Sequence, residues 1–161
     1  MNEPIKERLQ KELFDTEVST LNILLGGEMS AVDSYDEAIH RVRDAELIPT
    51  LVECRESHAL RAERLRQRLI DLGAHPKANA GIWGGIAKIA EAGASIVGDR
   101  AAIAILAGGE EYGLDQYTTY QQRLDSESSK LVEDELLPEQ MKTQRTLSVL
   151  SALLRKPKWS S

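Results

Sequence analysis

A twelve-residue pattern occurs twice in this chain of 161 residues, and on both occasions it is unusual for a helix. It reads LLGGEMSAVDSY at 24–35 and LAGGEEYGLDQY at 106–117. Each glycine destabilises a helix by about 1 kcal/mol relative to alanine, and a carboxylate on an apolar face is costly unless it is paired. The identities at an offset of 82 residues include Gly26 with Gly108, Gly27 with Gly109, Glu28 with Glu110, Asp33 with Asp115, and Tyr35 with Tyr117. The repeat predicts two related helical hairpins about a pseudo-twofold axis.

Apolar residues around both copies recur at steps of three and four, which is typical of amphipathic helices. Aromatic residues make up only 4% of the chain and runs of β-branched residues are absent, so we predict an all-α fold of four long helices. The expected bounds are Thr16 or Ser19 to about Arg43, Asp44 to Gly73, an N-cap at Asp99 to about Leu124, and Ser126 or Ser128 to about Leu154. Pro138 should kink or split the last helix.

The chain is long enough for one bundle domain over residues 1–161. Residues 1–15 are expected to form an N-terminal arm, 74–98 a crossover that contains a short helix, and 156–161 a loose tail. The short connections within each hairpin make the paired helices antiparallel. The long crossover could carry the chain along the length of the bundle.

Composition excludes several classes of function. The net charge of -6 and the pI of about 5.2 argue against nucleic-acid binding. No apolar run approaches the roughly 18 residues that span a bilayer, so no transmembrane segment is expected. Cys54 is the single cysteine, which favours a reducing compartment and a cytoplasmic location.

Four polar residues should share one layer in the middle of the bundle. Glu28 and His58 lie about equally far from the first hairpin turn, and Glu110 and Gln140 about equally far from the second. At a rise of about 1.5 Å per residue, antiparallel helices bring these side chains to one level. Thr143 lies one turn beyond the layer, and Tyr35 and Tyr117 lie two turns from their glutamates.

The paired glycines have two interpretations. Without Cβ atoms, Gly26 and Gly27 could allow close approach of the first helix to the third, where Gly108 and Gly109 lie. The alternative is a local kink in each helix. Because the pairs recur in register, we favour close approach.

The chain resembles the ferritin-like superfamily, and within it an uncharacterised bacterial family of four-helix proteins described only as a domain of unknown function. The resemblance covers nearly all of the chain after residue 18. It rests on the segments LNILLGGEMSAVDSY (21–35), GIWGGIAKIAEAGASIVGDRAAIAILAGGEEYGLDQY (81–117) and ELLPEQMKTQ (135–144). It implies a ferritin-like bundle with one crossover.

The chain matches only part of the ligand set that the resemblance implies for a di-iron site. Di-iron members carry single glutamates on two helices, which Glu28 and Glu110 match, and a Glu-x-x-His pair on the other two. Here arginine stands at position 55 before His58, while Gln140 and Thr143 replace the second pair. Glu56 and Glu139 lie off the inward stripes by one residue. We therefore predict no two-metal centre. A single Fe, Mn or Zn ion on Glu28, His58 and Glu110, or a carboxyl pair that shares a proton, stays as an alternative.

These patterns favour a non-enzymatic bacterial protein with a degenerate metal site, no catalytic residue and no cofactor, acting through association in a stress or housekeeping role. A homodimer is expected. The first alternative is a metal-binding protein that uses Glu28, His58 and Glu110. The second is a membrane-surface binder through residues 82–97, although a crossover helix packed on the bundle is the favoured interpretation of that segment.

Two further features of the second helix have structural explanations. Cys54 lies one turn before His58, and we favour a buried structural cysteine over a metal ligand. A set of arginines interleaves with glutamates and predicts an exposed, salt-bridged face. The set comprises Arg55, Arg61, Arg64, Arg66 and Arg68.

Overall fold

The computed structural model describes residues 2–79 and 98–155. Within them the chain is helical and contains no strand. The main helices are α1 (Glu3–Arg41), α2 (Ile48–Asp71), α4 (Asp99–Tyr120), α5 (Ser126–Leu131) and α6 (Leu137–Arg155). A 3₁₀ turn (Gln121–Arg123) follows α4, and a π-helical turn (Val132–Leu136) joins α5 to α6.

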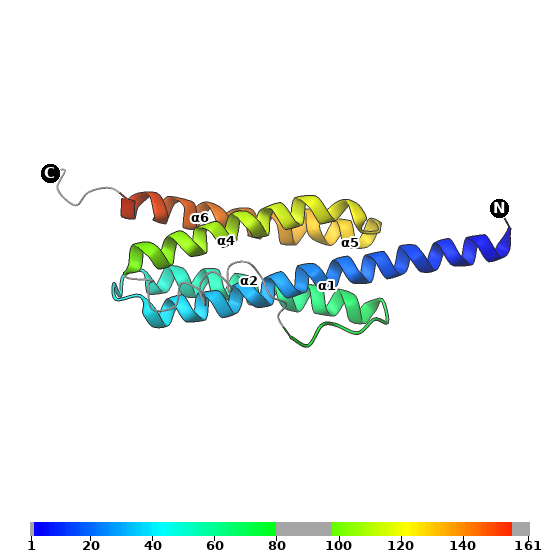
Figure 1. The fold of residues 1–161 in the computed structure, drawn as a ribbon, viewed down its shortest axis with the longest axis horizontal. Coiled ribbons are helices and arrows are strands. Elements are labelled where there is room, and N and C mark those ends of the chain that lie inside the picture. Colours follow the sequence, from blue (N-terminus) through cyan, green and yellow to red (C-terminus); the bar gives the residue numbers. More distant parts are fainter. Residues whose placement is uncertain (1, 80–97, 156–161) are drawn as a thin grey trace.

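The helices form two antiparallel hairpins that lie side by side (Figure 1). α1 packs mainly against α2, and α4 packs mainly against α6. α2 ends at one end of the bundle and α4 begins at the other, so the connection between them spans its length (Figure 1). The all-α fold of two hairpins is therefore confirmed. The short helix expected in the crossover lies outside the described residues.

The prediction that the first bundle helix begins at Thr16 or Ser19 is wrong. α1 begins at Glu3, with Pro4 in its first turn, and continues without a break to Arg41. Residues 3–15 thus form a helical arm that projects beyond the other helices (Figure 1). Every residue from Asn2 to Thr16 is exposed. Good helix formers such as glutamate, lysine and leucine dominate the arm, so nothing in the local sequence stops the helix before the bundle.

Two helix ends, the end of α2 and the start of α5, use specific caps. Gly73 has φ +73°, and its N–H donates to Ile70 O, while Ala74 N–H donates to Leu69 O, which ends α2 as a glycine C-cap. The Asp125 carboxylate accepts from Ser128 N–H at 2.7 Å and begins α5.

The sequence predicted that Asp99 is the N-cap of its helix, and this prediction is wrong, because the N-cap is Gly98. Asp99 is the first residue of α4, and its carboxylate accepts from the backbone N–H groups of Arg43 and Asp44 at 2.8 and 2.9 Å. Glu17 lies 82 residues earlier, and it accepts a short hydrogen bond from the hydroxyl of Ser128, just after the opposite turn. Each hairpin therefore holds the turn of the other, as the pseudo-twofold repeat requires.

The helix changes type just before Pro138, in the segment where the sequence predicted a kink or a split, but the backbone stays helical from Ser126 to Arg155. A proline inside a helix lacks an N–H donor and its ring collides with the carbonyl four residues earlier. The π-helical turn over Val132–Leu136 widens the backbone at this position. The chain then continues as α6 with Gln140 and Thr143 buried.

Two apolar clusters fill the bundle, one toward each end. One contains Tyr35, Leu51, Ile103, Leu106 and Leu147 among its buried members. The other is built from the following residues, all buried: Leu21, Leu24, Leu25, Ala62, Leu65, Leu69, Tyr117, Val132 and Leu136. The polar layer predicted from the sequence lies between the two clusters, so its side chains are shielded from solvent at both ends.

The glycine prediction is wrong at one of its four positions. Gly108 is exposed, and a Cβ built there would meet no atom within 4 Å, so it does not lie at a close helix contact. Gly26 and Gly109 are buried, and Gly27 is half-buried. Tight packing also occurs at Gly113, where a Cβ would lie 2.9 Å from Gln140 Nε2.

Over the described residues, no helix combines the length and the apolar character needed to cross a bilayer.

Candidate functional site

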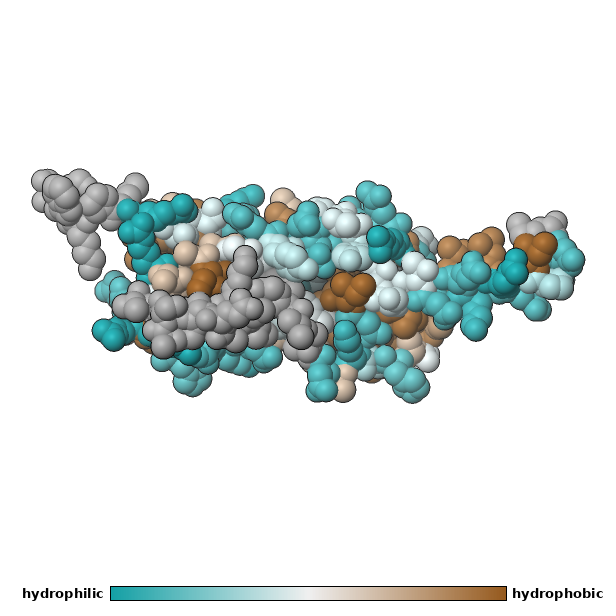
Figure 2. Space-filling model, in the orientation of Figure 1, coloured by the Kyte–Doolittle hydropathy of each residue, from teal (hydrophilic) through white to brown (hydrophobic). Residues whose placement is uncertain are grey.

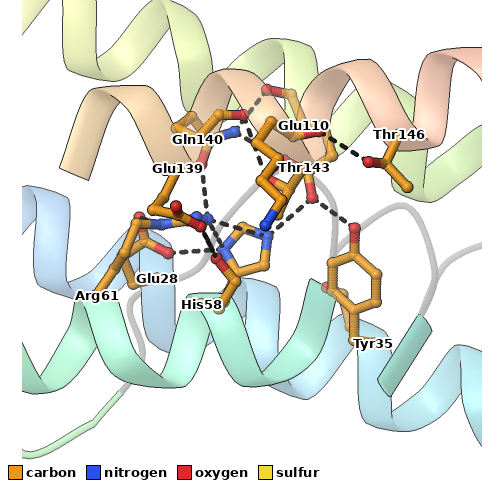
Figure 3. Close-up of polar contacts among 12 residues, drawn as sticks. Glu28, Tyr35, His58, Arg61, Glu110, Glu139, Gln140, Thr143 and Thr146 are labelled. Carbon is orange, nitrogen blue, oxygen red and sulfur yellow. Dashed lines mark hydrogen bonds and ion pairs between the residues drawn. The ribbon is translucent and has the colours of Figure 1, made fainter. Parts of the chain in front are cut away.

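The polar layer joins all four long helices (Figure 3). Glu28 comes from α1, His58 from α2, Glu110 from α4 and Gln140 from α6. All four are at most 3% exposed. The structure therefore brings together the residues that the sequence placed at one level.

His58 is the centre of the layer and contacts both buried carboxylates. Its Nδ1 lies 2.6 Å from Glu28 Oε2, and its Nε2 lies 2.8 Å from Glu110 Oε1. An imidazole that donates from both nitrogens is protonated. Burial opposes protonation of His58, but Glu28 and Glu110 outweigh it and raise the pKa of His58, which favours an imidazolium between the two carboxylates.

Each of the two tyrosines donates a hydrogen bond to the glutamate of the other hairpin. The Tyr35 hydroxyl of α1 donates to Glu110 Oε1 at 2.5 Å, and the Tyr117 hydroxyl of α4 donates to Glu28 Oε1 at 2.6 Å. Each repeat thus supplies the hydrogen bond for the glutamate of the other. This exchange is the pseudo-twofold symmetry of the sequence expressed in side-chain contacts.

Arg61 is the residue that the sequence interpretation assigned wrongly. It was expected on the exposed arginine face, yet it is only 2% exposed and lies in the layer. Its Nε donates to Glu28 Oε1 at 2.9 Å, and its Nη2 donates to Gln140 Oε1 at 3.0 Å. Nη2 also lies 2.6 Å from His58 Nδ1, but two donors face each other there, so this contact is not a hydrogen bond.

The sequence did contain a signal for Arg61. The 82-residue offset that pairs His58 with Gln140 also pairs Arg61 with Thr143, a residue expected beside the layer. Helix rotation explains the mistake, because Arg61 and Ala62 are both buried on an inward face that is more than 100° wide. Arg55, Arg64 and Arg66 follow the prediction and form ion pairs with Asp36, Glu135 and Glu63 on half-buried or exposed surface. Arg68 is salt-bridged to Glu127 as predicted, but its side chain is only 14% exposed, so it does not belong to an exposed face.

Side chains of α6 donate hydrogen bonds to Oε2 and to the backbone oxygen of Glu110. Gln140 Nε2 donates to Glu110 Oε2 at 2.8 Å and to its backbone oxygen at 2.9 Å. The Thr143 hydroxyl donates to the same Oε2 at 2.7 Å. Gly113 makes room for this arrangement, since any side chain there would push against Gln140.

The charges of the layer are balanced. Burial by itself would raise the pKa of Glu28, but the Arg61 guanidinium and His58 outweigh it and lower that pKa to about 2. Burial opposes ionisation of Glu110 too, yet hydrogen bonding and charge from His58 lower its pKa. In turn, burial would lower the pKa of His58, but Glu28 and Glu110 raise it. Two carboxylates therefore face two cations.

The layer as arranged offers no uncommitted ligand atom to a metal ion. Both oxygens of Glu28, both oxygens of Glu110 and both nitrogens of His58 already contact protein donors or carboxylates. The Arg61 guanidinium adds a positive charge where a divalent cation would have to sit beside Glu28. In the part of the chain that the structure describes, no three His, Cys, Asp or Glu side chains are grouped to hold a metal.

The other candidate groups lie outside the layer or are inert. Glu56 and Glu139 are exposed, and the Ser57 hydroxyl donates to the Glu139 carboxylate at 3.3 Å. Burial, and then the charge of Glu110, raise the pKa of the Cys54 thiol to about 11. A thiol that stays protonated is a poor nucleophile. Cys54 is buried in the apolar cluster beside Tyr35, as a structural cysteine would be.

Comparison with known proteins gives one family and one related structure. The family model Domain of unknown function (DUF2383) matches residues 16–123. No curated protein matches the chain.

A crystal structure of a two-domain protein from Anabaena variabilis ATCC 29413, containing DJ-1/ThiJ/PfpI-like and ferritin-like domains, is similar with a TM-score of 0.68. The sequences are 18% identical, and the match covers 89% of this chain and 40% of that one. This likeness shows the fold, and the expected ferritin-like architecture is confirmed.

Proposed function

Since the chain belongs to the family described as Domain of unknown function (DUF2383), we propose that it is a ferritin-like protein without catalytic activity, which acts through association with other protein surfaces. In this proposal the polar layer is a structural element that has lost its metal. A stress-related or housekeeping setting remains a prediction.

The observation that carries the proposal is the saturation of the layer by its own side chains. A catalytic metal site keeps an open coordination position, and a general acid or base needs access to a substrate. Here every ligand atom of Glu28, His58 and Glu110 is engaged, and the three side chains are at most 3% exposed. A small cavity beside them, lined by Gly27, Glu28 and Tyr117, has room for about one water molecule.

Arg61 supports the same conclusion. Its guanidinium donates to Glu28 and Gln140 from the middle of the bundle, so a fixed protein cation neutralises a carboxylate that a metal ion could otherwise neutralise. Removing a metal from such a layer would leave two buried carboxylates unpaired, which is strongly unfavourable. An arginine and an imidazolium avoid this cost without any metal.

The competing hypothesis is a single Fe, Mn or Zn ion on Glu28, His58 and Glu110. The convergence of both carboxylates on one imidazole favours it, because such a set needs only modest movement to become a ligand set. The membrane-surface alternative concerns residues 82–97, which lie outside the described residues.

Metal analysis distinguishes the hypotheses. The chain, purified without a histidine tag, is equilibrated with Zn²⁺, Mn²⁺ or, anaerobically, Fe²⁺, and its metal content is measured after desalting. We expect no stoichiometric metal and no di-iron-type absorption after the iron sample is oxidised. The matched variants are Glu110→Gln and Glu139→Gln, one in the layer and one exposed on α6. One or two metal ions per chain, lost in Glu110→Gln but kept in Glu139→Gln, would overturn the proposal.

A further inference from the structure

The arm formed by residues 3–15 carries a row of exposed apolar side chains. Ile5, Leu9 and Leu13 follow one another at intervals of four residues and are 46%, 44% and 62% exposed. Figure 2 shows hydrophobic surface on this projecting end of the molecule. An apolar stripe of this kind is normally buried against another element.

The row continues directly into the core. Three further steps of four residues lead from Leu13 to Glu17, Leu21 and Leu25, all of which are buried. Because each step of four residues turns about 40° around a helix, the row winds gradually along α1. Leu13 lies on the face that α1 buries inside the bundle, and Leu9 and Ile5 lie progressively to one side of it. The arm projects past the ends of the other helices (Figure 1).

We propose that this row is covered by the arm of a second copy of the chain, in an antiparallel pair whose two-fold axis passes beside Leu9. This pairing rests on the proposed role in association and names its partner. It sets Leu9 against Leu9, and Ile5 of each copy against Leu13 of the other. Thirteen residues of helix span about 20 Å, so the two arms overlap over their full length before either meets the bundle of the other copy.

The charges beside the row select this arrangement. Arg8 and Glu12 flank the row on one side, and Lys6, Gln10 and Phe14 flank it on the other. In an antiparallel two-fold pair the same flanks meet, so Arg8 of each copy lies beside Glu12 of the other. A parallel pair would instead bring Arg8 beside Lys6 of the other copy, which is repulsive.

A groove on α6 also exposes apolar side chains, but its charges do not favour contact between two copies of the groove. This open groove of about 660 Å³ runs along α6 and is lined by Met141, Val149 and Leu153. Lys142 and Arg145 also line it. Two copies of the groove facing each other would bring these cations together, so the groove does not favour pairing with itself.

The oligomeric state of the full chain tests the proposal. Light scattering over a concentration series should give twice the 17.9 kDa mass of one chain at the upper concentrations. Leu9→Glu and Leu13→Glu should give a monomer with unchanged helical circular dichroism, because both side chains are already exposed. The matched control is Val149→Glu, at a side chain that is 55% exposed in the α6 groove, and it should leave the dimer intact.

Two further variants test the register. Arg8→Glu and Glu12→Arg should each weaken the dimer at least several-fold, and the double variant should restore it. Leu9→Cys should form an intermolecular disulfide on mild oxidation, because facing Cα atoms at a usual interhelix distance lie within disulfide reach. Ile23→Cys, an exposed site within the bundle, should not.

A monomeric wild-type chain at every concentration, a dimer that survives Leu9→Glu, or a dimer lost only in Val149→Glu would each overturn the pairing. These outcomes are independent of metal content. A metal-free monomer would overturn arm pairing alone, whereas a metal-loaded dimer would overturn the interpretation of the polar layer alone.

Discussion

The hydroxyl of Tyr35 on α1 donates to the carboxylate of Glu110 on α4 at 2.5 Å, across the boundary between the two hairpins. Its counterpart 82 residues later, Tyr117, donates back to Glu28 at 2.6 Å. The two bonds tie the hairpins together at the level of the polar layer. Both are buried and both go to an ionised acceptor, which makes them stronger than neutral hydrogen bonds.

Replacing either tyrosine should therefore lower the free energy of unfolding by a similar amount. Tyr35→Phe and Tyr117→Phe each remove a donor from a buried carboxylate, and we expect each to lower the free energy of unfolding by about 1–3 kcal/mol. Urea denaturation followed by circular dichroism measures the change. A cost confined to one of the two tyrosines would contradict the exchanged arrangement.

Arg61→Ala should be far more destabilising than loss of a surface arginine. It removes one of the two cations that contact the buried Glu28, and loss of one partner of a buried ion pair typically costs about 3–5 kcal/mol. The matched control is Arg64→Ala, which breaks the exposed pair with Glu135 and should cost less than about 1 kcal/mol. Equal effects of the two substitutions would show that Arg61 is not held in the layer in solution.

Stability should depend on pH through His58 and Glu28. Folding raises the pKa of His58 above its ordinary 6.5, so its contribution is complete below about pH 6.5 and is lost as the pH rises through the folded pKa. Folding lowers the pKa of Glu28 from 4.5 to about 2, so its contribution is complete above about pH 4.5 and is lost as the pH falls toward 2.

The urea midpoint should accordingly be highest between about pH 4.5 and 6.5 and should fall on both sides. His58→Gln should flatten the alkaline side, because the glutamine cannot titrate. An alkaline decline of unchanged steepness in that variant would assign the effect to another group.

Two glycines of α4 should respond in opposite directions to the same substitution. Gly113→Ala places a Cβ 2.9 Å from Gln140 Nε2 and displaces that side chain from Glu110, at a cost of about 1–3 kcal/mol. Gly108→Ala meets nothing within 4 Å and should stabilise the helix by up to about 1 kcal/mol. Thermal unfolding of both variants measures the difference, and a destabilised Gly108→Ala would contradict the open space at that position.

Much of the bundle could be predicted because its signals are local and periodic. Steps of three and four residues located the inward faces, and Leu21, Leu51, Leu65, Ile103 and Leu147 are all buried as those faces require. Equal distances from the hairpin turns placed Glu28, His58, Glu110 and Gln140 in one layer, because helix rise is constant.

The repeat alone did not reveal which glycines pack closely. Recurrence of the Gly-Gly pair suggested that all four residues face another helix, yet Gly108 is exposed. Gly113, which has no glycine partner in the repeat, makes a close contact with Gln140. Whether a missing Cβ matters depends on the side chain opposite, here Gln140, and sequence spacing does not give that distance.

The sequence by itself determined the all-α class, the two hairpins and the level of the polar layer, since these depend on helix periodicity and rise. The tertiary structure decided that α1 runs unbroken from the arm into the bundle, and that Arg61 turns inward. Residues 61 and 62 differ by 100° of rotation on a face wider than that, so either could point to the centre. Only the placement of Glu28 and Gln140 on neighbouring helices gives the guanidinium its buried partners.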